Sequence, residues 1–181
     1  MRSGGAILAD YPAAVKRRLA LLGAEATLAM GDATSADDFL RMLEQQNPTN
    51  RDAAKVRRLQ GILAELTGDY EEAIQLWEKV ENGHDRYARS RAALARVELL
   101  FRTEEIDAKK ATEELEKLRF VWRGDLFEFN LLKRLGDFYL EAGNYREALE
   151  TYKALVSNFP DLEESKDVTQ LMKDIFENLY L

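Results

Sequence analysis

Residues 129–161 read FNLLKRLGDFYLEAGNYREALETYKALVSNFPD, and this stretch decides the fold of the chain. Apolar residues recur in it at helical spacing as far as Tyr139, stop over residues 141–144, and resume at Tyr145. The pattern predicts two short amphipathic helices joined by a tight turn at Gly143. Because a helix pair of this size cannot bury both of its apolar faces alone, we expect similar pairs to stack on either side of it.

The same stretch resembles a tetratricopeptide repeat (TPR), a unit of about 34 residues with small and large side chains at fixed places. Its small residues Gly136 and Ala148 fall where the two helices of a pair cross closely. Gly143 ends the first helix, and Pro160 cannot extend the second. The other matching positions are Leu135, Tyr139, Tyr145 and Tyr152. The resemblance implies an all-α fold, a right-handed superhelix of stacked helix pairs.

Equivalent positions recur along the rest of the chain, so we divide it into four such pairs and a closing helix. Gly61 and Trp77 stand in the second pair where Gly136 and Tyr152 stand in the fourth. The third pair has a longer turn without glycine, at residues 102–107. We expect one TPR-like domain over residues 1–181, with pairs at about residues 17–50, 54–87, 88–125 and 129–162 and a C-terminal capping helix at residues 163–181.

The second helix of the first pair has a recognisable start. Ser35 directly precedes the helical pattern of residues 36–46, and a serine at that place accepts hydrogen bonds from the first free backbone N–H groups. Asp37 and Asp38 follow it, where negative charge is favourable near the positive end of the helix dipole. The sequence therefore predicts Ser35 as the N-cap.

The composition favours a soluble helical protein that binds other proteins. The chain has no cysteine, which excludes a disulfide framework, a thiol nucleophile and a cysteine-based zinc site. The apolar patch at residues 6–9 is too short for a signal peptide or a membrane span. A net charge of -7 argues against nucleic acid as the partner. Cytoplasm and bacterial periplasm both stay open as compartments.

No pattern in the sequence indicates an enzyme, a cofactor or a metal site. His84 is the only histidine and lies in a predicted turn, where an exposed side chain is the simplest interpretation. Glu113, Glu114 and Glu116 point in different directions on a helix, which favours a solvated face. We therefore expect a non-catalytic chain without a cofactor. A helical, non-catalytic part of a longer enzyme is a further alternative.

The first helices of the pairs are rich in basic residues, and the second helices are mainly acidic. The resemblance implies that first helices line a concave groove, so these residues are candidates for partner binding: Arg18, Lys55, Arg58, Arg89, Arg96 and Lys133. Such a groove suits an acidic peptide or a C-terminal carboxylate, because arginine binds carboxylates in a bidentate way. The alternative is that these charges are solvated and form local ion pairs.

The resemblance thus implies a protein-interaction module, an adaptor or assembly scaffold that holds a protein or peptide partner. Some related domains clamp a terminal carboxylate with lysine and asparagine, but Ile62 stands where the first such asparagine would be. That particular clamp is therefore not expected here.

The C-terminal helix carries an apolar stripe that no predicted neighbour covers. Candidate self-association residues on it are Phe176, Leu179 and Leu181. An exposed stripe of this kind indicates a homodimer, or a natural protein that continues beyond it. The alternative function is accordingly a self-association module of a larger bacterial assembly, in the envelope, motility or secretion, as the resemblance implies.

The two tryptophans have different predicted roles. Trp77 stands at a repeat position that packs between helices, so we expect it in the core. Trp122 lies in a connection close to Phe127 and Phe129, and this cluster is interpreted as a plug between repeats. A partner hot spot at Trp122 is the alternative.

Overall fold

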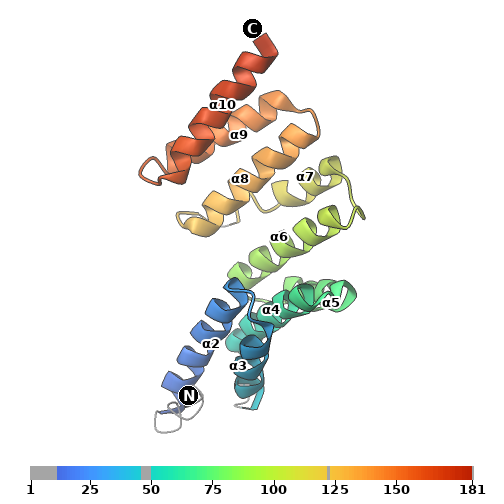
Figure 1. Ribbon diagram of the computed structural model, residues 1–181, viewed down its shortest axis with the longest axis vertical. Helices are drawn as coiled ribbons and strands as arrows, with labels where there is room; N and C mark the ends of the chain where they lie inside the picture. Colours follow the sequence, from blue (N-terminus) through green and yellow to red (C-terminus); the bar gives the residue numbers. More distant parts are fainter. Residues whose placement is uncertain (1–11, 46–49, 122, 181) are drawn as a thin grey trace. The chain divides into compact units, whose positions relative to one another are not determined.

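The computed structural model describes residues 12–45, 50–121 and 123–180. All regular elements within these ranges are α-helices (Figure 1): α2 (Ala13–Ala29), α3 (Ala33–Gln45), α4 (Asn50–Thr67), α5 (Tyr70–Glu81), α6 (Arg86–Arg102), α7 (Ala108–Glu116), α8 (Leu126–Glu141), α9 (Tyr145–Asn158) and α10 (Glu164–Tyr180). The all-α prediction is confirmed. The chain divides into two compact units, Met1–Ala92 and Ala93–Leu181, and the division falls within α6.

The first unit is built from two helical hairpins that share one interior. Helix α2 packs against α3, α4 packs against α5, and α4 also contacts both α2 and α3. Small side chains let the helices approach, since Ala20, Ala24 and Ala36 are completely buried. The rest of this core is formed by Leu28, Leu40, Leu43, Val56 and Leu59.

The second unit is also built from neighbouring helices that share one core, and its core side chains are larger. Helix α8 contacts α7 and α9, and α9 contacts α10; Figure 1 shows α8, α9 and α10 as successive hairpin partners. Their common core contains Phe129, Leu132, Ala148, Tyr152, Leu155, Val168 and Ile175. Helix α10 thus covers an apolar face of α9, as the sequence predicted for the closing helix.

A glycine in the first helix faces an aromatic ring in the second helix of two hairpins. A Cβ atom at Gly61 would overlap the indole of Trp77, and one at Gly136 would overlap the phenol ring of Tyr152. Both rings are fully buried. The helices therefore cross so closely that only glycine fits, which explains why these two pairs of positions matched in the sequence. The prediction that Trp77 belongs to the core is confirmed.

The turn between α6 and α7 has the same backbone geometry as the glycine turns, although it lacks glycine. Glu104 takes the left-handed conformation with φ 61°, as Gly143 does with φ 76°. The N–H of Glu105 donates to the carbonyl of Leu100 at 2.9 Å, and the N–H of Asn144 donates to that of Tyr139 at 2.8 Å. These are the hydrogen bonds of a Schellman cap, so the structure places a glutamate where this cap favours glycine.

Replacing Glu104 by glycine should raise the free energy of unfolding by about 0.5–1 kcal/mol. The left-handed conformation costs a residue with a side chain roughly 1–2 kcal/mol, and the greater freedom of glycine in the unfolded chain offsets about 0.5–1 kcal/mol of the gain. Urea unfolding followed by circular dichroism measures the change. Glu105→Gly removes the same charge without relieving a positive φ and should destabilise. A Glu104→Gly midpoint at or below that of the unchanged protein would contradict the assignment.

One helix begins earlier than the sequence predicted, and another is short. Helix α3 begins at Ala33, and its cap is Asp32 rather than Ser35, because the Ser35 N–H donates to Asp32 Oδ1 at 3.0 Å. The hydrogen bonds from Ser35 lower the pKa of Asp32. Helix α7 ends at Glu116, and residues 117–121 form turns instead of a continued helix.

Candidate functional site

Arg58 was predicted to face the groove, but its side chain lies in the interior of the first unit. It is only 7% exposed, and its Nη2 donates to Oε1 of Glu25 at 3.0 Å, from α4 to α2. Its backbone carbonyl accepts a hydrogen bond from Nε1 of Trp77 at 3.2 Å. The prediction of a surface position was wrong because helical spacing does not reveal that α2 covers this side of α4.

The charge of Arg58 is only partly compensated in this interior. Burial, followed by repulsion from Arg91, lowers the pKa of Arg58 to about 10, while Glu25 acts in the opposite direction. The guanidinium is still charged at neutral pH. Arg91, in the first turns of α6, also lies over the ring of Tyr87, at 5.5 Å from the ring centroid. The guanidinium groups of Arg58 and Arg91 therefore lie close enough to repel each other, and of the two Arg58 is held by Glu25.

The other predicted basic residues are more accessible than Arg58. In the first unit, Arg18 and Arg89 are exposed and Lys55 is half-buried. In the second unit, Arg96 and Lys133 are half-buried. Partner binding by these residues stays a prediction.

Lys133 belongs to a polar network inside the second unit. Its Nζ lies 3.1 Å from Oδ2 of Asp137, and the Tyr152 hydroxyl donates to Oδ1 of the same carboxylate at 2.7 Å. Burial and this carboxylate raise the pKa of Tyr152. Arg134 is also near this network, since its Nη1 lies 4.0 Å from Oδ2 of Asp137. Lys133 therefore has a structural partner within its own helix.

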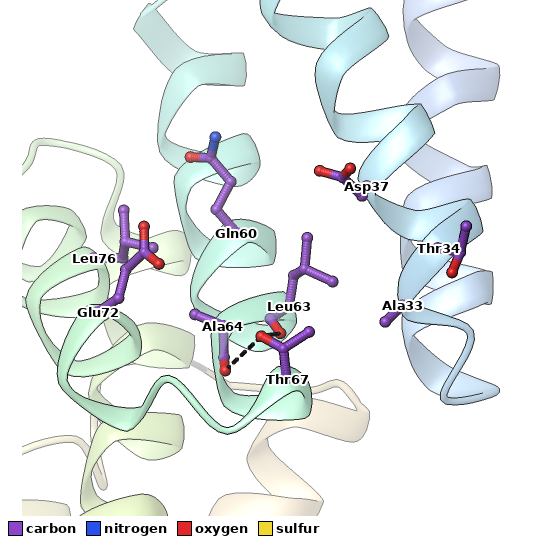
Figure 2. Close-up of a pocket in the computed structure, with 9 residues that line it drawn as sticks. All are labelled: Ala33, Thr34, Asp37, Gln60, Leu63, Ala64, Thr67, Glu72 and Leu76. Carbon is purple, nitrogen blue, oxygen red and sulfur yellow. Dashed lines mark hydrogen bonds between the residues drawn. The ribbon is translucent and has the colours of Figure 1, made fainter.

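A pocket that sequence reasoning missed lies between α3, α4 and α5 of the first unit. Figure 2 shows side chains from all three helices around it, with Asp37 on one wall and Glu72 on another. Its volume is about 520 Å³. The lining consists of Ala33, Thr34, Asp37, Gln60, Leu63, Ala64, Thr67, Glu72 and Leu76. The sequence could not predict this pocket, because its lining comes from three separate helices and contains no recognisable motif.

A second pocket, of about 450 Å³, lies between α9 and α10. Its apolar lining includes Leu149, Met172 and Phe176, and four charged side chains surround these: Glu150, Lys153, Lys173 and Glu177. Phe176 is 54% exposed and Leu179 is 39% exposed, so the predicted stripe is accessible in this chain. Leu181 lies outside the described residues, and so does Trp122.

The residues considered for metal binding or catalysis are not gathered into a site. His84 is exposed, and Glu114 forms ion pairs with Lys110 at 3.3 Å and Lys117 at 2.9 Å. Among the described residues, no group of three or more histidine, cysteine or acidic side chains could hold a metal ion. None of the helices placed by the structure is both long enough and apolar enough to cross a membrane.

Comparisons with known proteins agree with the helical-repeat architecture. The tetratricopeptide repeat family matches at residues 134–162. Two solved structures of MamA AMB-1, from different crystal forms, resemble this chain at TM-scores of 0.56 and 0.57 with 17% and 18% sequence identity. Each covers 91% of this chain, and the matched parts are 89% and 83% of those chains. No curated protein sequence matches this one. At such low identity, the likeness to MamA concerns the fold.

Proposed function

We propose that this chain, which matches the tetratricopeptide repeat family at residues 134–162 and has an all-helical, TPR-like fold, is a non-catalytic protein-interaction module that binds an acidic protein segment. The binding surface is the electropositive part of the first unit, formed by α2, α4 and the first turns of α6. Arg91 would contact the carboxylates of the partner. Arg18, two turns before Glu25 on α2, and Lys55, one turn before Arg58 on α4, would extend the same surface. Arg89 points to another side of α6 and lies outside this surface.

The observation that supports this proposal is the closeness of two like charges, the guanidinium groups of Arg58 and Arg91. Arg58 is held in place by Glu25 at 3.0 Å, and Arg91 is close enough to lower its pKa. A carboxylate from a partner would relieve the repulsion between the two guanidinium groups. Arginine also suits this role because its planar fork binds carboxylates in a bidentate way.

Binding to the stacked hairpins costs little conformational entropy of the protein. The helices fix the backbone of every basic residue before the partner arrives, so that mainly the bound segment loses freedom. Because the helices are rigid, the charged surface is ready for a partner without a conformational change. An interaction of this kind weakens with salt, because the exposed charges are screened over roughly 10 Å at 0.1 M ionic strength.

An octaglutamate peptide labelled with fluorescein tests the proposal by fluorescence anisotropy at low salt. The double variant Arg18→Glu/Arg91→Glu should bind it at least about tenfold more weakly, since two carboxylate contacts become repulsions. Lys79→Glu/Lys109→Glu is the matched control: it changes the net charge equally, on exposed residues of second helices. The control should bind within about twofold of the unchanged protein. Equal losses in both double variants, or no binding to the unchanged protein, would refute the proposal.

A second candidate function is self-association through α10, supported by the open apolar pocket between α9 and α10. Phe176 borders this pocket and is 54% exposed, an unusual degree for a large aromatic side chain. Sedimentation equilibrium should give a mass near twice 20.7 kDa. Phe176→Asp should return it to the monomer mass. Phe120→Asp, which replaces another exposed phenylalanine, should leave the dimer intact, and a monomeric unchanged protein would exclude this function.

A further inference from the structure

The pocket between α3, α4 and α5 combines an apolar floor with acidic walls. Leu63 and Ala64 of α4 and Leu76 of α5 supply the apolar surface. The carboxylates of Asp37 and Glu72 come from different helices, and Figure 2 shows them on different sides of the cavity. Among the described residues, no lysine or arginine lines it. The charge of the lining is therefore negative, in contrast to the electropositive surface described above.

The uncharged polar groups of the pocket also favour a ligand that donates hydrogen bonds. The Thr67 hydroxyl donates to the carbonyls of Leu63 and Ala64 at 3.0 and 3.1 Å, which uses its only proton and leaves its oxygen as an acceptor. The side-chain amide of Gln60 donates to Glu44. This bond orients the amide nitrogen of Gln60 towards Glu44. The side-chain carbonyl oxygen of Gln60 is then a further acceptor.

One carboxylate of this pocket already binds a guanidinium within the chain. Nη2 of Arg41 lies 2.8 Å from Oδ2 of Asp37, one helical turn away on α3. The side chain of Arg41 is 69% exposed and does not line the pocket. An exposed ion pair of this kind contributes at most about 1 kcal/mol. A cation from another molecule can therefore compete with Arg41 for Asp37.

From these observations we propose that the α3–α4–α5 pocket binds a basic, amphipathic segment of a partner protein. An apolar side chain or the aliphatic stem of a lysine packs between Leu63 and Leu76. The ammonium or guanidinium groups of the segment face Asp37 and Glu72. This surface differs from the one proposed for acidic partners, both in the helices that form it and in the sign of its charge.

An octapeptide of alternating lysine and leucine, labelled with fluorescein, tests the pocket by anisotropy at low salt. Asp37→Asn/Glu72→Gln should weaken binding at least about fivefold, because both carboxylates are lost. Asp161→Asn/Glu163→Gln removes the same charge from exposed residues of the other unit and should change binding by less than about twofold. If both double variants lose affinity equally, the peptide responds only to net charge and the proposal fails.

Two single variants separate a specific pocket from general attraction to an acidic protein. Arg41→Gln removes the internal competitor for Asp37 and should tighten binding about two- to fivefold, whereas Lys166→Gln, in the exposed pair with Glu163, should have little effect. Thr34→Trp fills the pocket without changing charge and should abolish binding while circular dichroism stays unchanged. Unaltered binding to Thr34→Trp would overturn the proposal. An octapeptide of alternating glutamate and leucine should respond to none of these variants.

Discussion

Replacing Trp77 by alanine should lower the free energy of unfolding by about 3–5 kcal/mol, because it removes a fully buried aromatic side chain and leaves a cavity. The indole also donates a hydrogen bond to the carbonyl of Arg58 at 3.2 Å, and the variant would lose this bond. The effect is measured by urea unfolding followed by circular dichroism. Trp77→Phe keeps most of the ring and should cost markedly less.

The glycine opposite the ring provides an internal control for this result. Gly61→Ala should destabilise the unchanged protein, since the new Cβ overlaps the indole of Trp77. In the Trp77→Ala background, the same substitution should stabilise by up to about 1 kcal/mol, because alanine is the better helix former and the space is now open. If Gly61→Ala has the same effect in both backgrounds, the close crossing of α4 and α5 does not exist as described.

Replacing Arg58 by glutamate should cost about 3–5 kcal/mol, because it puts an unpaired carboxylate at a position that is only 7% exposed and places it beside the carboxylate of Glu25. Urea midpoints of the variant and the unchanged protein measure this. Arg18→Glu, on an exposed residue of α2, is the matched charge reversal and should change stability by less than about 0.5 kcal/mol. The exchange Arg58→Glu/Glu25→Arg should recover part of the loss. If Arg58→Glu is as stable as the unchanged protein, the side chain at position 58 lies at the surface.

The sequence was sufficient for the helices and for the hairpins they form. Its periodicity located the helices, and glycines such as Gly61 and Gly136 marked the close crossings, because both signals are local in the chain. The cap at Asp32 and the left-handed conformation of Glu104 were missed. Aspartate and serine are both favoured N-cap residues, so the local sequence did not decide between Asp32 and Ser35. The turn at residues 102–107 was predicted, but a residue other than glycine gives no sign of a positive φ.

The candidate binding surfaces could be predicted only in part. A pattern of basic residues indicates which side of a helix they share, but not which neighbouring helix covers that side. Arg58 and Lys55 lie close together in sequence, yet α2 buries the first and leaves the second partly accessible. The acidic pocket depends on contributions from α3, α4 and α5, so no single stretch of the sequence carried its signature.

Lys173 in α10 stands where Gly136 stands in α8. It follows the buried Ala148 of α9 by the same number of residues as Gly136 follows the buried Ala111 of α7. A long cationic side chain at this register leaves no room for an aromatic ring of another hairpin helix to enter as closely as Tyr152 does. An engineer who adds a helix after α10 with the close crossing of Gly136 and Tyr152 would therefore have to place glycine at position 173, because a Cβ atom at this register overlaps the entering ring.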